Sequence, residues 1–162
     1  MTVVNYNSLE YEAQPKKQIN LKGVPFNSVK SHFTYAESSA NDGDTFVLAS
    51  ALSSNAIVKS IFADTPAMTA GADNDIMICK HGETTAVEVA TGKSNLLVDG
   101  KTFATALVHS DILGSGLTGF DYSKSLGEIT GLDGAFDIVL SIKTKATAGG
   151  TMCFTVESAD NL

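Results

Sequence analysis

Histidines and their spacing are the first place to look for chemistry in this chain. The three histidines, His32, His81 and His109, lie far apart, and no Gly-x-Ser-x-Gly elbow or cysteine-centred catalytic signature accompanies them. A small hydrolase would need one of them to meet an acid and a hydroxyl in a cleft. We therefore predict that the chain is not an enzyme, and a small hydrolase remains an alternative.

Two glycine-rich segments are similar to phosphate-binding loops. Residues 114–119 match G-x-G-x-x-G, with Asp137 about twenty residues further on, and Gly92-Lys93-Ser94 is similar to the end of a P-loop. A dinucleotide fold requires a full helix after such a loop, whereas residues 120–131 offer little more than one helical turn. The first glycine of a P-loop would fall at Val87, which cannot supply its backbone geometry. Both segments are predicted to be turns, and no cofactor is expected.

Two pairs of aspartates could contribute ligands to calcium. Asp42 with Asp44, and Asp73 with Asp75, place carboxylates two residues apart beside Gly or Asn. Calcium needs about six or more oxygen ligands, and neither pair has the rest of an EF-hand loop. We expect solvated turn caps and no metal, and a structural Ca²⁺ at either pair stays open.

The cysteine count, the net charge and the length of the apolar runs exclude several functional classes for this chain. Cys79 and Cys153 are too few for a disulfide scaffold and too distant for a local zinc knuckle, so we predict two free thiols. Eleven lysines, no arginine and eighteen carboxylates give a net charge of −7, which disfavours nucleic acid as a partner. Apolar runs are far shorter than the roughly 20 residues of a membrane span, and no signal pattern opens the chain. A soluble, unexported protein is expected.

The chain divides into an arm and a body. Residues 1–30 show neither alternation nor helical spacing, which predicts an extended N-terminal arm, and residues 31–162 are predicted to be one domain. Four lysines against two glutamates give the arm a charge of +2 and leave −9 for the body. The arm is expected to be loosely ordered alone and to bind a partner through apolar anchors and two lysines, namely Tyr6, Tyr11, Lys16, Lys17, Val24 and Phe26.

The body is predicted to be all-β. Its clearest strand is 136–145, with Phe136, Ile138, Leu140 and Ile142 on one face, and an alternating segment at 151–156 predicts a closing hairpin with it. Weaker strands are expected at 31–36, 44–50, 56–63, 75–80, 84–90 and 102–109, and Asp99-Gly100 suggests a tight turn. Ser125 and Glu128 form a capping box for one short helix that Gly131 ends. About eight strands indicate a jelly-roll-like antiparallel β-sandwich.

Several of these segments together are similar to a known family. They are Ala56-Ile57-Val58 leading to Asp64-Thr65-Pro66, then Asp73-Asn74-Asp75-Ile76, residues 124–132, residues 136–140, and Ala148-Gly149-Gly150-Thr151 with residues 152–156. From about residue 31 to residue 156 the chain resembles the auxiliary head proteins of tailed bacteriophages, the decoration or cement proteins of the capsid. Family members often carry an aromatic residue where this chain has Gly127, and the arm lies outside the resemblance.

The resemblance implies a structural role. Such proteins are compact β-sandwiches that bind the outside of an expanded capsid shell, as oligomers at or near local symmetry axes. It implies the major capsid protein and further copies of this chain as partners, with a trimer favoured, on the outer capsid surface of a virion assembled in the bacterial cytoplasm. The alternative is a tail or fibre adhesin that recognises host glycans, although the chain has no Trp for sugar stacking.

Overall fold

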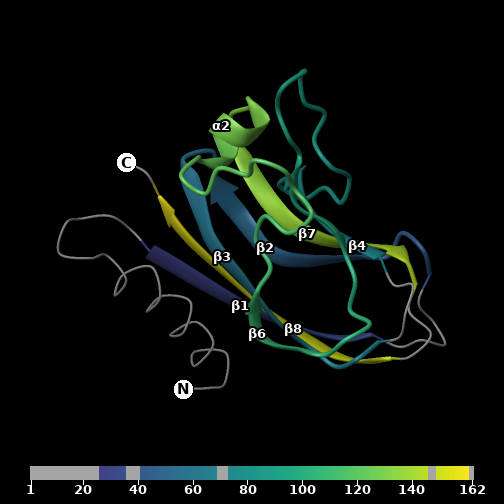
Figure 1. Cartoon of the computed structure of the whole chain (residues 1–162). Helices are drawn as coiled ribbons and strands as arrows, with labels where there is room; N and C mark the ends of the chain where they lie inside the picture. Colours follow the sequence, from purple (N-terminus) through teal and green to yellow (C-terminus); the bar gives the residue numbers. More distant parts are fainter. Residues whose placement is uncertain (1–25, 36–40, 69–72, 146–148, 161–162) are drawn as a thin grey trace, which may run out of the picture.

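The computed structural model describes residues 26–35, 41–68, 73–145 and 149–160, in which eight antiparallel strands form two four-stranded sheets. The first sheet contains, in spatial order, β1 (Phe26–Tyr35), β8 (Gly150–Asp160), β3 (Ala56–Thr65) and β6 (Leu107–Asp111). The second contains β2 (Thr45–Ser53), β7 (Ala135–Thr144), β4 (Asp73–Lys80) and β5 (Leu96–Lys101). The sheets pack face to face, and the short helix α2 (Leu126–Thr130) lies at one end of the sandwich (Figure 1).

The strand order is that of an eight-stranded jelly roll. Consecutive strands cross from one sheet to the other at every connection except β4 to β5, which are neighbours in the second sheet. The predicted all-β, jelly-roll-like sandwich with one short helix is therefore confirmed for the described residues. Most neighbouring strands are distant in sequence, so the fold depends on long-range pairing.

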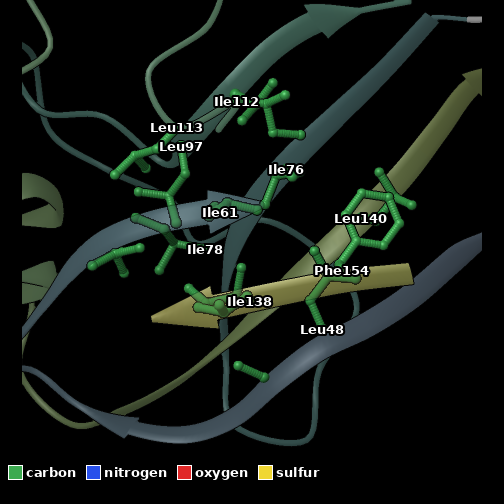
Figure 2. Packing of buried hydrophobic residues seen from close by; sticks show 14 of the residues in the cluster. Leu48, Ile61, Ile76, Ile78, Leu97, Ile112, Leu113, Ile138, Leu140 and Phe154 are labelled. Atoms are coloured by element: carbon green, nitrogen blue, oxygen red, sulfur yellow. The ribbon is translucent and has the colours of Figure 1, made fainter. Parts of the chain in front are cut away.

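The core fills the space between the two sheets. Leu48, Ile76, Ile78, Ile138 and Leu140 of the second sheet meet residues of the first sheet (Figure 2). The predicted inward faces are confirmed, because the residues assigned to them in β7 and β8 are at most 1% exposed: Phe136, Ile138, Leu140, Ile142, Met152, Phe154 and Val156. Period-two alternation alone predicts that these side chains share one face of each strand.

The predicted closing hairpin is wrong. Strand β7 pairs with β2 and β4, whereas β8 pairs with β1 and β3, so the last two strands lie in opposite sheets. The apolar faces of β7 and β8 lie opposite each other across the core. Alternation shows that each strand has one apolar face, and it fits strands that lie side by side and strands that face each other equally well.

The boundary between arm and body lies earlier than predicted. Residues 26–30 belong to β1, whose backbone pairs with β8 from Phe26 opposite Ala159 to Tyr35 opposite Gly150. Val29 is partly buried against the core, but Asn27 and Ser31, two residues away on either side, are polar and interrupt the apolar alternation. A long neighbouring strand supplies backbone partners that make up for the weak apolar pattern.

The structure differs from three further local predictions. Residues 84–90 form no strand, and only Ala86 makes an isolated bridge, with Cys79. Strand β6 begins at Leu107 rather than at 102. Asp99-Gly100 lies within β5 instead of a hairpin turn, because the Gly100 N–H donates to the Asp75 side chain (2.8 Å). In each case a contact distant in sequence decides the local structure.

Helix α2 confirms its sequence signature. Ser125 is the N-cap, its side chain and that of Glu128 form the capping box, and Gly131 ends the helix with φ of 74°. Leu126 is fully buried, and the Gly127 N–H donates to the Ser54 carbonyl (2.7 Å) in the connection between β2 and β3. The helix is thereby fastened to the sandwich end.

Candidate functional site

Asp137 organises a polar cluster on the outer face of the second sheet. It lies on β7 between β2 and β4 and is only 3% exposed. Its Oδ1 accepts hydrogen bonds from Ser50 Oγ (2.9 Å) and the Ala51 N–H (2.8 Å) and contacts His81 Nδ1 (2.9 Å), and its Oδ2 accepts from the Gly82 N–H (2.9 Å). We call these five residues the Asp137 cluster. One carboxylate thus connects β2 to the turn after β4.

The hydrogen bonds keep this carboxylate ionised. Burial raises the pKa of Asp137, but hydrogen bonds from Gly82, His81, Ala51 and Ser50 outweigh that effect and leave the pKa below its ordinary value. An ionised carboxylate only accepts hydrogen bonds, so Nδ1 of His81 must carry the proton in their contact. The imidazole is therefore held with Nδ1 toward Asp137.

The same carboxylate stabilises an unusual backbone at Ala51. Ala51 has φ of 57°, a left-handed conformation that is costly for a residue with a Cβ. The register between β2 and β7 shifts between Ala49 and Leu52, which marks a bulge there. Because the Ala51 N–H donates to Asp137, the bulge has a fixed partner within the fold.

An acid, a histidine and a hydroxyl do meet in the Asp137 cluster, so a hydrolase has to be considered. In a nucleophile–base–acid relay, the hydroxyl and the acid contact opposite nitrogens of the imidazole. Here Ser50 Oγ (3.3 Å) and Asp137 Oδ1 (2.9 Å) both contact Nδ1 of His81, and Ser50 donates to Asp137. Because both groups contact the same nitrogen of the imidazole, His81 is not placed to accept the Ser50 proton. The hydrogen bonds of the Asp137 cluster join β2 to the turn after β4.

Sequence reasoning missed the Asp137 cluster. Asp137 alternates with Phe136, Ile138 and the other apolar residues of its strand, a pattern that places it on the face turned away from the core. The available signal was a carboxylate inside a strongly apolar central strand, which is rare unless the carboxylate has partners. His81 and Ser50 carried no signal, since their contacts with Asp137 join segments 56 and 87 residues apart.

The second aspartate pair lies in an ion-pair network. The carboxylates of Asp73, Asp75 and Asp99 lie 4.0, 3.1 and 3.9 Å from Lys143 Nζ. The hydrogen bond to Asp75 and then its charge raise the pKa of Lys143, with Asp73 and Asp99 adding to the effect. The ammonium lies where these carboxylates converge. Within the described ranges, no group of three or more His, Cys, Asp or Glu side chains is placed to hold a metal ion.

The first aspartate pair caps backbone, as predicted. Asp42 Oδ1 accepts from the Lys145 N–H (2.8 Å), and Asp44 Oδ2 accepts from the Asn41 N–H (2.8 Å). Both carboxylates therefore fasten the turn before β2, and one of them connects it to the end of β7. This agrees with the interpretation as turn caps.

The two glycine-rich turns lie beside each other near α2. Residues 92–94 and 117–121 line a shallow hollow of about 250 Å³ together with Lys124, Glu128 and Ile129. Lys93 Nζ donates to the Glu128 carbonyl (3.1 Å), which fastens one turn to the helix. At Gly116 a Cβ would meet the Asp99 carbonyl, so this glycine permits close packing against β5. The glycines serve as turn residues, as predicted.

His109 lies in a strained segment at the edge of the first sheet. His109 has φ of 44°, its ring stacks on Phe62 with centroids 4.2 Å apart, and its N–H donates to Asp64 Oδ1 (2.7 Å). The preceding Val108 is 81% exposed, more than Val47 or any other large hydrophobic side chain that the structure describes. We call Phe62, Val108 and His109 the β6 patch.

The two cysteines lie on different sheets, Cys79 in β4 and Cys153 in β8. Cys79 and Cys153 are reduced thiols that form no disulfide bond, as predicted. Burial, followed by the charges of Asp137 and Glu83, raises the pKa of Cys79 to about 11. His32 lies in β1, with its backbone opposite Cys153. Of the predicted arm residues, Phe26 begins β1, so it is not part of a separate arm. The others lie outside the described residues: Tyr6, Tyr11, Lys16, Lys17 and Val24.

Comparisons with known proteins identify no relative. No family model, no curated protein and no solved structure matches the chain. Among the described residues, no helix is long and apolar enough to cross a membrane.

Proposed function

We propose that this protein is a structural virion protein that binds the outer surface of a tailed-phage capsid and stabilises the shell. The observation that carries the proposal is the position, in the fold, of the segments that resemble decoration proteins. They fall on β3, β4, α2, β7 and β8, which belong to both sheets and contribute residues to the core. The resemblance therefore concerns strands of both sheets rather than one loop.

The polar clusters support binding rather than catalysis. The Asp137 carboxylate contacts four partners, which lie in β2 and in the turn after β4. Three aspartates surround the ammonium group of Lys143. Both arrangements stabilise one backbone geometry. A body whose Asp137 and Lys143 clusters are bonded internally suits a protein that must present fixed surfaces to a shell.

The proposed partners are the major capsid protein and further copies of this chain, with a trimer favoured. Residues 1–25 contain Tyr6, Tyr11 and Val24 as apolar anchors and Lys16 and Lys17 as cations. We propose that this segment secures the contact with a neighbour, because the rest of the chain is acidic and attracts a basic segment. Neither nucleic acid nor a membrane is a proposed partner.

A capsid-binding titration tests the proposal. Purified protein is mixed with expanded capsids that lack it, the capsids are sedimented, and the bound protein is measured against its concentration. We expect saturation at hundreds of copies per capsid. The adhesin alternative predicts no binding to the shell and a few copies at the tail of intact particles. Absence of saturable binding to capsids would contradict the proposal.

A further inference from the structure

The β6 patch contains one of the two strained non-glycine residues in the described chain. These residues are Ala51 and His109, with φ of 57° and 44°. Strain of this kind persists only where surrounding contacts impose it, and it often marks a functional surface. At Ala51, which is also exposed, the imposing contact comes from the buried carboxylate of Asp137. At His109 the strained residue is itself at the surface, so its conformation shapes what solvent and partners meet.

Three contacts fix the backbone around Val108. The His109 N–H donates to Asp64 Oδ1, the His109 ring lies nearly parallel to Phe62 (8° between the planes), and Ser110 Oγ donates to the Val108 carbonyl (3.3 Å). The β3–β6 register shifts here, since Ala63 pairs with Ser110 but Thr65 pairs with Leu107. The result is a bulge that directs Val108 into solvent.

The bulge determines how a partner can use this edge. Strand β6 is the last strand of its sheet, so its outer side has no strand partner among the described residues. A bulge twists such an edge and blocks the addition of another strand. The edge therefore presents side chains, with Val108 as a preformed apolar anchor beside the Phe62–His109 stack. A rigid anchor loses little conformational freedom on binding.

The charges near the patch indicate the chemistry of its partner. Asp64, with a side chain 44% exposed, and the exposed Asp111 lie on the two strands that carry the patch. Lys30, in register with Phe62, lies two strands away. Two copies meeting through the same patch would bring four carboxylates together, which disfavours symmetric self-association. A partner with an apolar pocket and a rim of Lys or Arg fits this surface.

We infer that the β6 patch is the surface by which this protein docks on the capsid shell, with Val108 inserted into an apolar pocket that basic residues surround. This inference rests on the proposed function and specifies the face that carries it. It differs from the proposed role of residues 1–25, because it assigns the first contact to a rigid part of the body.

Two matched substitutions test the inference. Val108→Lys places a cation against the expected basic rim, whereas Val47→Lys makes the same change at a 41% exposed valine of the other sheet. We expect Val108→Lys to weaken capsid binding at least tenfold in the sedimentation titration and Val47→Lys to bind as the wild type does. Val108→Ser, which removes the anchor without adding charge, should also weaken binding. Thermal unfolding of each variant controls for folding.

The outcomes separate this inference from the proposed function. If the wild type binds capsids and Val108→Lys binds equally well, the inference is wrong while the proposed function stands. An equal loss with Val47→Lys would also overturn it, because the effect would not be specific to the patch. If Val108→Lys changes the oligomeric state in sedimentation velocity without capsids, the patch is instead a contact between copies. If the wild type does not bind, the proposed function itself fails.

Discussion

Removing the Asp137 carboxylate should destabilise the whole sandwich. Asp137→Ala leaves Ser50 and His81 free to bond with water, because both side chains are exposed, but it deprives the N–H groups of Ala51 and Gly82 of their acceptor. Each unsatisfied, partly buried donor costs about 1–3 kcal/mol, so we expect a loss of about 2–5 kcal/mol in the free energy of unfolding. For a domain of this size that corresponds to a decrease of roughly 5–15 °C in Tm.

The assay is urea denaturation followed by circular dichroism, with calorimetry for Tm. Asp137→Asn, which keeps the volume and one acceptor oxygen, should lose less, about 1–3 kcal/mol. The matched control is Asp133→Ala, an exposed aspartate just before β7, which should change stability by no more than about 0.5 kcal/mol. If Asp137→Ala were as stable as the Asp133→Ala control, the hydrogen bonds of the Asp137 cluster would not hold β2 to the turn after β4.

Three further predictions concern pH, the core and α2. Because the folded pKa of Asp137 lies below its ordinary value of 3.8, the wild type should lose stability as pH falls below about 3.8, and Asp137→Asn should show a shallower acid dependence in urea titrations. Phe154→Ala or Leu140→Ala should cost about 2–5 kcal/mol, since both side chains are fully buried, and an unchanged Tm for both would refute the core assignment. Gly127→Ala should lower Tm, because its Cβ would lie 3.0 Å from the backbone oxygen of Ser54, and a Tm equal to that of the wild type would show that the helix end can shift.

Local patterns were sufficient to predict the elements whose structure depends on neighbouring residues. The capping box of Ser125 and Glu128 and the C-cap at Gly131 involve contacts within a few residues, and both are present. The inward face of β7 follows from period-two alternation, and its residues are buried. The all-β class follows from the same signals. The count of eight strands agrees only because the wrongly predicted strand at 84–90 offsets β5, which was not among the predicted strands.

The other features depend on contacts between distant segments. The sheet in which β8 lies is decided by its pairing with β1 and β3, and alternation carries no information on pairing. Gly100 stays in β5 because Asp75, 25 residues away, accepts its N–H. The strain at Ala51 and His109 likewise depends on Asp137 and Asp64. These are tertiary effects that one sequence read locally does not reveal.

Cryo-electron microscopy of the intact virion tests the central claim most directly. We predict that density for the jelly-roll body covers the outside of the expanded shell in hundreds of copies per particle, at or near local symmetry axes, with β6 facing the shell. A bare shell, with the protein absent from the particle or confined to a few copies at the tail, would contradict the claim that this protein decorates and stabilises the capsid.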